Sequence, residues 1–328
     1  MIRKYRSEGY NYDFDTNTGF FARWGKTYED DPQMSPIGAE ILDIEVSEAC
    51  HQGCKFCYKS NTGVGKNMTL ATFKTILDKM PSVMQIAFGI GDLSANPDLF
   101  PMMEYARSKN VVPNITINGA GLTDELAKKL VSLVGACSVS RYNDDQCYNA
   151  VNKLTSLGLT QVNIHQLVAE ETYDSIWKLL ESYKTDTRLA KLGYIVMLSL
   201  KRKGRGVGFN RMSDEHFSEI VEYCINNDIR VGFDSCGANK VEKILRNMNL
   251  HNIEQVCQSI EPCESSGFSA YCNVEGKFFP CSFAEGEFEG IDVVNCNTFL
   301  DDVWYNPKVV TWRERLLNQC RNCPMYDI

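Results

Sequence analysis

The sequence predicts an α/β protein, a partial (β/α)6 TIM-like barrel followed by a small β-hairpin and helix domain. From Ile41 onward, apolar β-rich runs alternate with amphipathic helical patterns, which is typical of βα units and a parallel sheet. Three cysteines, Cys50, Cys54 and Cys57, stand in one short loop directly after the first of these runs. A second group of cysteines, among glycines and aromatics, follows residue 236.

The chain has 328 residues, which suits a barrel of about 200 to 250 residues with an appendage. We divide it into an aromatic extension at 1–38, a barrel at 39–236 and a C-terminal cluster domain at 237–328. In the extension, the stretch 15–19 lies between two aromatic arms, so it predicts a β-hairpin. We expect the aromatic side chains of this extension to pack on the edge of the barrel.

The alternation predicts each element of the barrel in turn. Thr69 and Thr123 are helix caps in this interpretation, and Pro97 stands in a first helical turn. A further short strand at 231–236 ends in a cysteine. The six main strands are expected at 41–46, 83–88, 112–118, 136–140, 160–168 and 193–200, and the helices at 69–80, 97–108, 123–133, 144–157, 173–184 and 213–226.

Composition limits the function classes. No apolar run approaches the roughly 18 residues that span a bilayer, and Met1 begins a polar stretch without the apolar core of a signal peptide. We therefore expect a cytoplasmic protein without membrane contact, whose 14 cysteines are reduced thiols and cluster ligands. The net charge of −8 argues against extended nucleic-acid binding, although a single nucleotide as substrate is not excluded.

The spacing C-x3-C-x2-C of Cys50, Cys54 and Cys57 predicts a metal-cluster loop. Three thiolates can hold three irons of a [4Fe-4S] cube and leave the fourth iron open to a small molecule. Structural zinc usually takes four ligands in pairs, and a disulfide framework needs an even set in a secreted chain. His51 could complete a zinc site, so a zinc alternative stays open.

This loop resembles the signature of the radical S-adenosylmethionine (radical SAM) enzymes, C-x3-C-x-aromatic-C, with Phe56 as the aromatic residue. The resemblance implies that the open iron binds SAM. An electron from the cluster then splits SAM into methionine and a 5′-deoxyadenosyl radical, which abstracts hydrogen from a substrate. It also implies that Phe56 lies near the adenine, and that a flavodoxin or ferredoxin type of protein donates the electron.

Further motifs follow the predicted strands. Gly91 and Asp92 sit where the family has a G-G-E-P motif that holds the methionine group of SAM, but Ile90 replaces a glycine and Asp92 is shorter than the usual glutamate. Asn118 resembles the asparagine of the family's T-N-G turn. The resemblance offers three more cofactor contacts after later strands, Ser140, Arg141 and Arg205, and His165 on the fifth strand is a further candidate.

Two of these candidates, His165 and Arg205, have another interpretation. His165 interrupts an apolar strand and either meets a ligand or is a hydrogen-bonded core histidine. Arg205 belongs to a segment similar to a K-x-x-G-R-G/A stretch of the family and would hold the SAM carboxylate or an acidic substrate group. The neighbouring run Lys201 to Lys203 is more typical of a solvated face.

The C-terminal cysteines resemble the twitch domain, a shortened SPASM domain. The pattern Cys263-x12-Gly276-x4-Cys281, followed by Cys320-x2-Cys323, implies four ligands of an auxiliary [4Fe-4S] cluster. Strands at 269–273 and 277–280 would form a hairpin that brings the first two thiols together. The chain ends soon after Cys323, so we expect one auxiliary cluster. Two further thiols, Cys272 and Cys296, are candidates to replace a ligand, and a four-cysteine zinc site is the alternative.

The sequence therefore predicts a radical SAM oxidoreductase of the maturase type, whose auxiliary cluster transfers an electron and whose substrate is a small molecule or a peptide. Cys236, at the end of the last strand, suggests a second hypothesis, a redox-neutral epimerase or isomerase in which its thiol donates hydrogen to a substrate radical. Cys236 is otherwise a small buried hydrophobe. Outside enzymes, the alternatives are a non-catalytic iron–sulfur protein and a zinc-binding protein.

Overall fold

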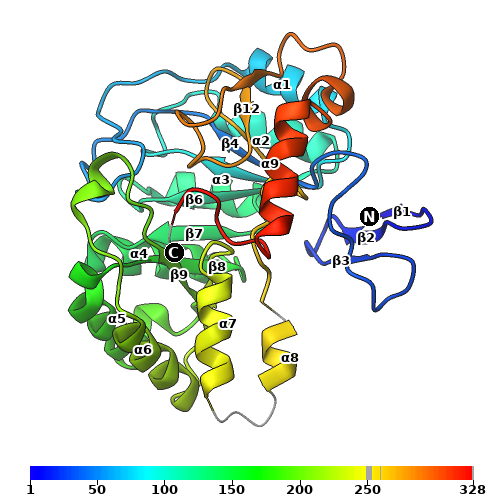
Figure 1. Ribbon diagram of the computed structural model, residues 1–328. Coiled ribbons are helices and arrows are strands. Elements are labelled where there is room, and N and C mark those ends of the chain that lie inside the picture. The colour runs from blue at the N-terminus through cyan, green and yellow to red at the C-terminus, as the bar shows by residue number, and fades with distance from the viewer. Residues whose placement is uncertain (249–252, 259, 327–328) are drawn as a thin grey trace.

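The computed structural model describes residues 1–248, 253–258 and 260–326 (Figure 1). Its centre is one sheet in which seven successive strands are parallel neighbours. The six strands predicted from residue 41 onward and the short strand after them are all confirmed. They are β4 (Ile41–Glu45), β5 (Gln85–Gly89), β6 (Val112–Ile117), β7 (Cys137–Ser140), β8 (Val162–Val168), β9 (Ile195–Ser199) and β10 (Val231–Phe233).

The predicted helices lie between these strands. Thr69 and Thr123 cap their helices, since each side chain accepts a hydrogen bond from an amide of the first turn. Pro97 does not begin a helix, because Asn96 accepts from the Asp98 amide at 2.9 Å and fixes a turn there. The helices are α1 (Leu70–Lys79), α2 (Leu99–Ser108), α3 (Asp124–Leu133), α4 (Asp144–Ser156), α5 (Tyr173–Thr185) and α6 (Asp214–Asn226).

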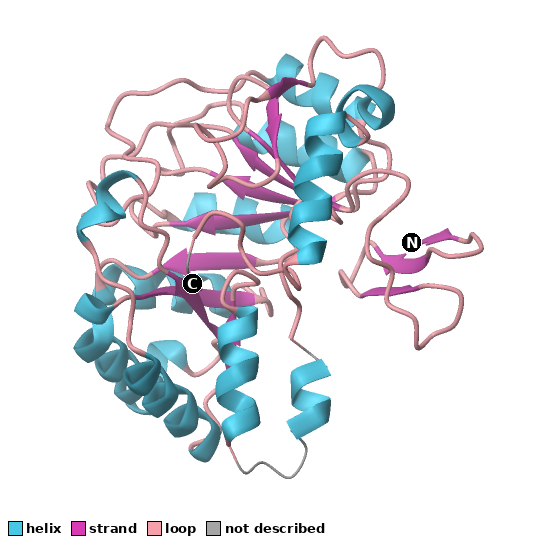
Figure 2. Ribbon diagram, viewed as in Figure 1, coloured by secondary structure: helices cyan, strands magenta, loops and turns pink. Residues whose placement is uncertain are grey.

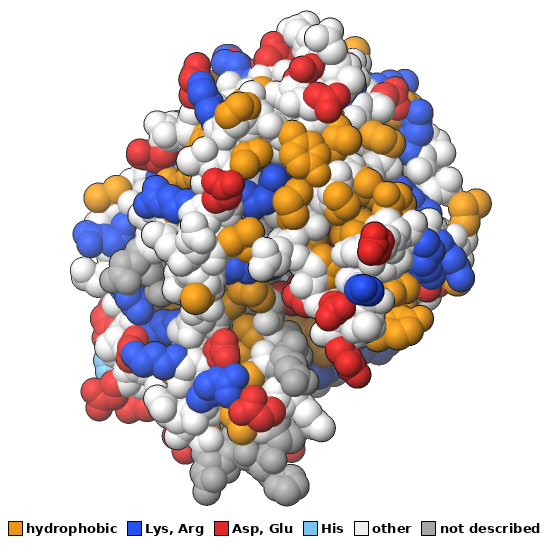
Figure 3. All heavy atoms as spheres, turned by 45° about the vertical axis from the view of Figure 1, so that its right-hand side comes forward, with side chains coloured by type: hydrophobic (Ala, Val, Ile, Leu, Met, Phe, Trp, Pro, Cys, Tyr) orange, Lys and Arg blue, Asp and Glu red, His pale blue; other side chains and the backbone are white. Residues whose placement is uncertain are grey.

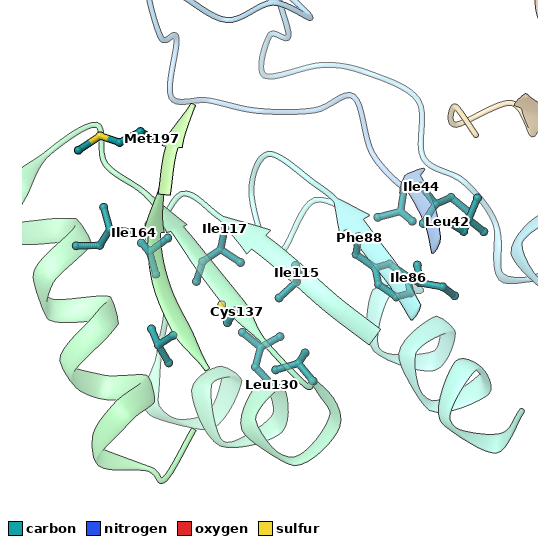
Figure 4. Packing of buried hydrophobic residues seen from close by; sticks show 14 of the residues in the cluster. Leu42, Ile44, Ile86, Phe88, Ile115, Ile117, Leu130, Cys137, Ile164 and Met197 are labelled. Carbon is teal, nitrogen blue, oxygen red and sulfur yellow. The ribbon is translucent and has the colours of Figure 1, made fainter. Parts of the chain in front are cut away.

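The two faces of the parallel strands differ in chemistry. Buried apolar side chains such as Ile44, Phe88 and Ile164 alternate along the strands and form the core with the helices, as Figure 4 shows. The intervening positions are only partly buried and carry many polar side chains. They include Asp43, Asn114, Thr116, Ser138, Ser140, Asn163 and His165. The face away from the helix-packed core is therefore suited to a polar ligand.

The C-terminal segment extends the same sheet. β11 (Ser269–Cys272) pairs in parallel with β4, and β12 (Lys277–Phe279) and β13 (Ile291–Asp292) follow as antiparallel strands. The predicted hairpin is thus confirmed, with Gly276 at φ +78° in its turn. The remaining elements are α7 (Ala238–Asn247), α8 (Ile253–Gln258), α9 (Pro307–Asn318), three 3-10 helices (Glu170–Thr172, Thr187–Leu189, Gly204–Gly208) and a π-helix (Leu300–Trp304).

The N-terminal extension forms a separate antiparallel sheet of β1 (Ile2–Tyr5), β2 (Asn11–Asp15) and β3 (Phe21–Trp24), seen beside the main sheet in Figure 2. Its buried aromatic side chains pack on Met84, Val112 and Phe268, which lie at or directly before the start of strands of the main sheet, so the extension packs on this sheet as expected. Met84 directly precedes β5 and Val112 begins β6. The extension therefore covers the end of these strands opposite to their C-terminal loops.

Figure 3 shows the molecule turned by 45° about the vertical axis, so that the right-hand side of Figure 1 faces the reader. Hydrophobic side chains gather in its upper part, and acidic and basic side chains are interspersed around them. No helix of the described residues is both long enough and apolar enough to cross a membrane.

Candidate functional site

The three clustered thiols of Cys50, Cys54 and Cys57 lie in the loop after β4, at the C-terminal end of the parallel strands. The Cys50 amide donates to the Thr62 carbonyl at 2.7 Å, and the Cys57 amide donates to the Cys54 carbonyl at 3.2 Å. The pKa of the Cys54 thiol is raised to about 11, mainly by burial and also by the charges of Cys50 and Cys57. The thiols are thus close enough to interact, and a bound cation would stabilise all three as thiolates.

Two glycines let the backbone approach this loop closely. A Cβ atom at Gly91 would lie 2.7 Å from the Ala49 carbonyl oxygen and 2.9 Å from the Cys50 sulfur. At Gly204, where φ is +54°, a Cβ atom would lie 2.7 Å from the Cys57 carbonyl oxygen. Any larger residue at either position would displace the loop, so these glycines define the space beside the thiols.

Arg205 supports the cysteine loop directly. Its guanidinium Nε donates to the Cys54 carbonyl at 2.8 Å and an Nη donates to the Asn61 carbonyl at 3.0 Å. Its own amide donates to the Cys57 carbonyl at 3.0 Å. In this arrangement Arg205 fixes the backbone that carries the thiols, and its contact to a cofactor stays a prediction.

Asp92 and Asn118 meet beside the same loop, although they come from the ends of β5 and β6. Asp92 Oδ1 accepts from the Asn118 side chain at 3.0 Å, and Oδ2 accepts from the His51 amide at 2.8 Å and contacts His51 Nδ1 at 2.6 Å. Burial opposes ionisation of Asp92, but these hydrogen bonds outweigh it and lower its pKa. Burial raises the pKa of the Cys50 thiol, and a hydrogen bond from the Asn118 side chain opposes part of this rise. His51 is therefore engaged by Asp92.

The aromatic residue of the loop has its own partners. The Phe56 ring packs on Tyr142 and Phe209, with centroid distances of 5.7 and 5.8 Å. Ser140, the last residue of β7, hydrogen-bonds the Tyr142 hydroxyl. Phe56 and Ser140 therefore belong to one group on the polar side of the sheet, next to the cysteine loop.

Arg141 and His165 are placed differently. The buried Arg141 guanidinium donates to Gln166 Oε1 at 2.9 Å and to Ser175 Oγ at 2.8 Å, and it forms an ion pair with Asp144 at 2.6 Å. It therefore joins β8 to α4 and α5. Burial lowers the pKa of His165 to about 4, so its imidazole is neutral at pH 7. Cofactor contacts by these two residues stay predictions.

A second group of thiols forms around the C-terminal hairpin. The pKa values of the Cys263 and Cys281 thiols are both raised to about 12, chiefly by burial. The charges of Cys281 and Cys323 contribute to this rise at Cys263, and the charges of Cys236 and Cys323 contribute to it at Cys281. Cys236, after β10, joins them, because Cys263 and Cys323 are among the charges that raise its pKa and it likewise raises that of Cys281. Cys320, the other predicted ligand, is exposed.

Cys272 and Cys296, the two thiols left unassigned by spacing, interact with each other. Burial raises the pKa of the Cys272 thiol, and Cys296 raises it further. The Cys296 thiol donates to the Val293 carbonyl at 3.2 Å. The Lys79 ammonium donates to the Cys296 carbonyl at 2.6 Å. These contacts tie the pair to the packing of α1 against the region around β13.

The thiols fit iron–sulfur cubes in number and surroundings. A cube binds each thiolate through a different iron, so its ligands surround a shared space rather than converge on one point. Among the residues that the structure describes, no three His, Cys, Asp or Glu side chains converge closely enough to hold a single metal ion. The loop after β4 offers three thiols and the second region offers four neighbouring thiols.

Sequence reasoning missed two features of this region. Lys201 was expected on a solvated face, and this was wrong for its side chain, which is buried in an ion pair with Asp234. Lys203 was also misplaced, because its ammonium is partly buried and donates to the Phe283 carbonyl at 2.8 Å. A carboxylate at the end of the neighbouring strand was the signal that could have indicated a partner for Lys201.

Comparison with known proteins gave distant relatives. No family model matches the chain. The tungsten-containing aldehyde ferredoxin oxidoreductase cofactor-modifying protein of Pyrococcus furiosus is 31% identical over 99 residues, which is 29% of this chain and 28% of that protein. Mycofactocin maturase MftC of Mycobacterium tuberculosis is 22% identical over 322 residues, which covers 87% of this chain and 76% of MftC.

Solved structures share the fold. Streptococcus suis SuiB, bound to precursor peptide SuiA, has a TM-score of 0.67 at 13% identity and is matched over 84% of this chain and 67% of its own. The protein anSMEcpe, with bound AdoMet and a Cp18Cys peptide, has a TM-score of 0.64 at 13% identity, over 87% of this chain and 86% of its own. These matches identify a mixed α/β fold with a large parallel sheet.

Proposed function

We propose that this chain, which belongs to the radical SAM superfamily of enzymes, reductively cleaves SAM and uses the resulting radical to abstract hydrogen from a peptide substrate. The observation that carries the proposal is the meeting of three thiols with Gly91, Asp92 and Asn118 at the C-terminal ends of β4, β5 and β6. That edge is where parallel α/β folds bind ligands.

Each of these residues would have a separate task. Cys50, Cys54 and Cys57 would hold three irons of the SAM-binding [4Fe-4S] cluster. The backbone beside Gly91 and the carboxylate of Asp92 would bind the amino group of SAM, because a carboxylate with a lowered pKa stays ionised and attracts an ammonium. When bound, the cluster would supply the electron that splits SAM into methionine and a 5′-deoxyadenosyl radical.

Residues of the polar face would orient the rest of the cofactor. Phe56 would contact the adenine, and Ser140 would lie near the ribose, because both belong to the group around Tyr142. Asn118 would hold Asp92 in place through its 3.0 Å hydrogen bond. Arg205 would keep the loop backbone fixed through the Cys54 carbonyl.

An auxiliary [4Fe-4S] cluster would occupy the second group of thiols. A cube with four protein ligands has no iron left for substrate, so its task would be electron transfer. A flavodoxin or ferredoxin type of donor would supply electrons to the enzyme. The hydrogen abstraction would then lead to oxidation or bond formation, with the auxiliary cluster accepting one electron from the substrate radical.

A peptide substrate is supported by two relatives. MftC is named a maturase, and SuiB has been solved with a precursor peptide. A small molecule is the other substrate class that a polar face of this kind would accept. Hydrogen abstraction from a peptide predicts that deuterium from a labelled precursor peptide appears in 5′-deoxyadenosine. An enzyme that acts on a small molecule would leave the 5′-deoxyadenosine free of deuterium and such peptides unmodified.

The cofactor content tests the proposal as a whole. After anaerobic reconstitution we expect about eight irons and eight sulfides per chain, from two cubes. The spectrum of the reduced protein should change when SAM is added, because SAM would bind the open iron. Stoichiometric zinc without iron would support the zinc-binding alternative and overturn the proposal.

A further inference from the structure

The thiol of Cys236 reaches the auxiliary region from the opposite edge of the sheet. It follows β10, which is the terminal strand on one side, whereas Cys263 and Cys281 flank β11 and β12 near the other side. Cys236 nevertheless interacts with Cys263, Cys281 and Cys323. Four thiols from three distant segments therefore lie near one another.

A buried ammonium lies at this meeting point. Lys201 hydrogen-bonds Cys236 and forms an ion pair with Asp234, and its ammonium lies 4.9 Å from the ring centroid of Phe283. Phe283 is two residues after Cys281. Lys201 thus contacts both the segment that carries Cys236 and the segment that carries Cys281.

The loop that carries Cys236 is fixed by local hydrogen bonds. Asp234 Oδ1 accepts from the Ser199 hydroxyl at 2.8 Å, and Oδ2 accepts from the Ser199 amide at 3.1 Å. The Gly237 amide donates to the Asp234 carbonyl at 3.0 Å. Cys236 therefore stands on a short turn anchored to β9, a position suited to a fixed ligand.

The C-terminal segment docks on the same loop. The Asn239 side chain donates to the Cys320 carbonyl at 3.4 Å and also bonds the Asn322 side chain. The Tyr326 ring packs on Phe283 at a centroid distance of 6.4 Å. Asn322 and Tyr326 are both held by these contacts, and Cys323 lies between them in the sequence. Cys323 is therefore brought to the group that contains Cys236.

Cys320 is placed differently. It has φ +52° in the turn that ends α9, where its amide donates to the Leu317 carbonyl at 3.2 Å. Cys320 is exposed, whereas the other four thiols of this region are partly buried: Cys236, Cys263, Cys281 and Cys323. The spacing C-x2-C suggested that both of its cysteines are ligands, but only Cys323 interacts with the other three thiols in the contacts described above.

We propose that Cys236, Cys263, Cys281 and Cys323 are the four ligands of the auxiliary cluster and that Cys320 is not. This inference rests on the proposed function, because it assigns ligands to the second cluster. The cluster would then join β10 to the hairpin of β11 and β12, linking the two sides of the sheet. It also excludes the hydrogen-donor hypothesis for Cys236, since a thiolate bound to iron carries no S–H hydrogen to donate.

The test uses the full chain with Cys50, Cys54 and Cys57 all changed to Ala, so that iron reports the auxiliary site alone. After anaerobic reconstitution, this background should hold about four irons and sulfides. Adding Cys236→Ala should lower the iron content to three or fewer and change the electron paramagnetic resonance spectrum of the reduced cluster. Adding Cys320→Ala, the matched control, should leave both unchanged.

The opposite pattern, with iron lost in Cys320→Ala and retained with an unchanged spectrum in Cys236→Ala, would overturn the ligand assignment while leaving the auxiliary cluster in place. A background without iron would overturn the auxiliary cluster itself. Cys236→Ser guards against misfolding, because a hydroxyl keeps the size of the side chain. We expect the Cys236→Ser variant to have the same far-ultraviolet circular dichroism spectrum as the background but an altered electron paramagnetic resonance spectrum. An unaltered electron paramagnetic resonance spectrum would contradict the assignment.

Discussion

The Tyr58 ring packs on the Phe283 ring at a centroid distance of 4.5 Å, and Tyr58 also hydrogen-bonds the Ser282 side chain. Tyr58 directly follows Cys57, and Ser282 directly follows Cys281. The loops that carry the two groups of thiols therefore touch through a partly buried aromatic pair. If both proposed clusters are present, this contact would give an electron a short route between them.

We expect Tyr58→Leu to weaken coupling between SAM cleavage and product formation, because the substitution removes the aromatic contact between the loops. The ratio of product to 5′-deoxyadenosine should fall several-fold. Tyr58→Phe keeps the ring and should retain a ratio close to that of the unchanged enzyme. An unchanged ratio in Tyr58→Leu, at equal cluster content, would remove Tyr58 from the electron route.

Gly91→Ala should reduce incorporation of the SAM-binding cluster. Its Cβ would lie 2.9 Å from the Cys50 sulfur and 2.7 Å from a backbone oxygen, so the cysteine loop would have to move. Gly208→Ala is the matched control, because a Cβ there meets no atom within 4 Å. Iron content after reconstitution is the measurement, and equal iron in both variants would contradict the close approach of Gly91.

Arg23→Ala should lower the free energy of unfolding by about 3 kcal/mol, because it leaves buried carboxylates without their partner. Arg23 forms ion pairs with Glu40 at 2.9 Å and with Glu264, next to Cys263, at 3.1 Å. Lys308→Ala, which breaks an exposed pair with Glu289, should cost less than about 1 kcal/mol. Urea unfolding measures both, and equal losses would show that the N-terminal sheet does not stabilise this region.

Asp43 predicts a dependence of stability on pH. Burial raises its pKa from 3.8 to about 6, so folding disfavours its ionised form. The cost is absent below pH 3.8, grows as the pH rises and is complete above about pH 6. Relative to the unchanged protein, Asp43→Asn should gain about 1 kcal/mol more stability at pH 8 than at pH 5. A gain independent of pH in urea titrations would show that Asp43 is not buried as a carboxyl group.

The regular elements could be predicted from sequence because each depends on local periodicity. The run from Ile41 to Val46, for example, appears as β4 within one residue of its expected end. The thiols of Cys50, Cys54 and Cys57 could be grouped because they are neighbours in the chain. The relation of Cys236 to Cys263 and Cys323 could not, because it depends on how distant segments meet across the sheet.

The roles of arginines were the least accessible to sequence reasoning. Arg141 and Arg205 both follow strands, as ligand-binding arginines often do. In the structure, Arg141 bonds Gln166, Ser175 and Asp144, and Arg205 bonds the carbonyls of the cysteine loop. A guanidinium has five donors, and which acceptors surround it depends on the packing of several elements at once.

Formation of 5′-deoxyadenosine tests the central claim most directly. The reconstituted enzyme, incubated anaerobically with SAM and a strong reductant, should release 5′-deoxyadenosine and methionine in equal amounts. Cys50→Ala, Cys54→Ala and Cys57→Ala should each abolish this release, because each removes one of the three thiols that anchor the SAM-binding cluster. Absence of 5′-deoxyadenosine from the fully reconstituted, unchanged enzyme, or its undiminished release by these three variants, would contradict the account.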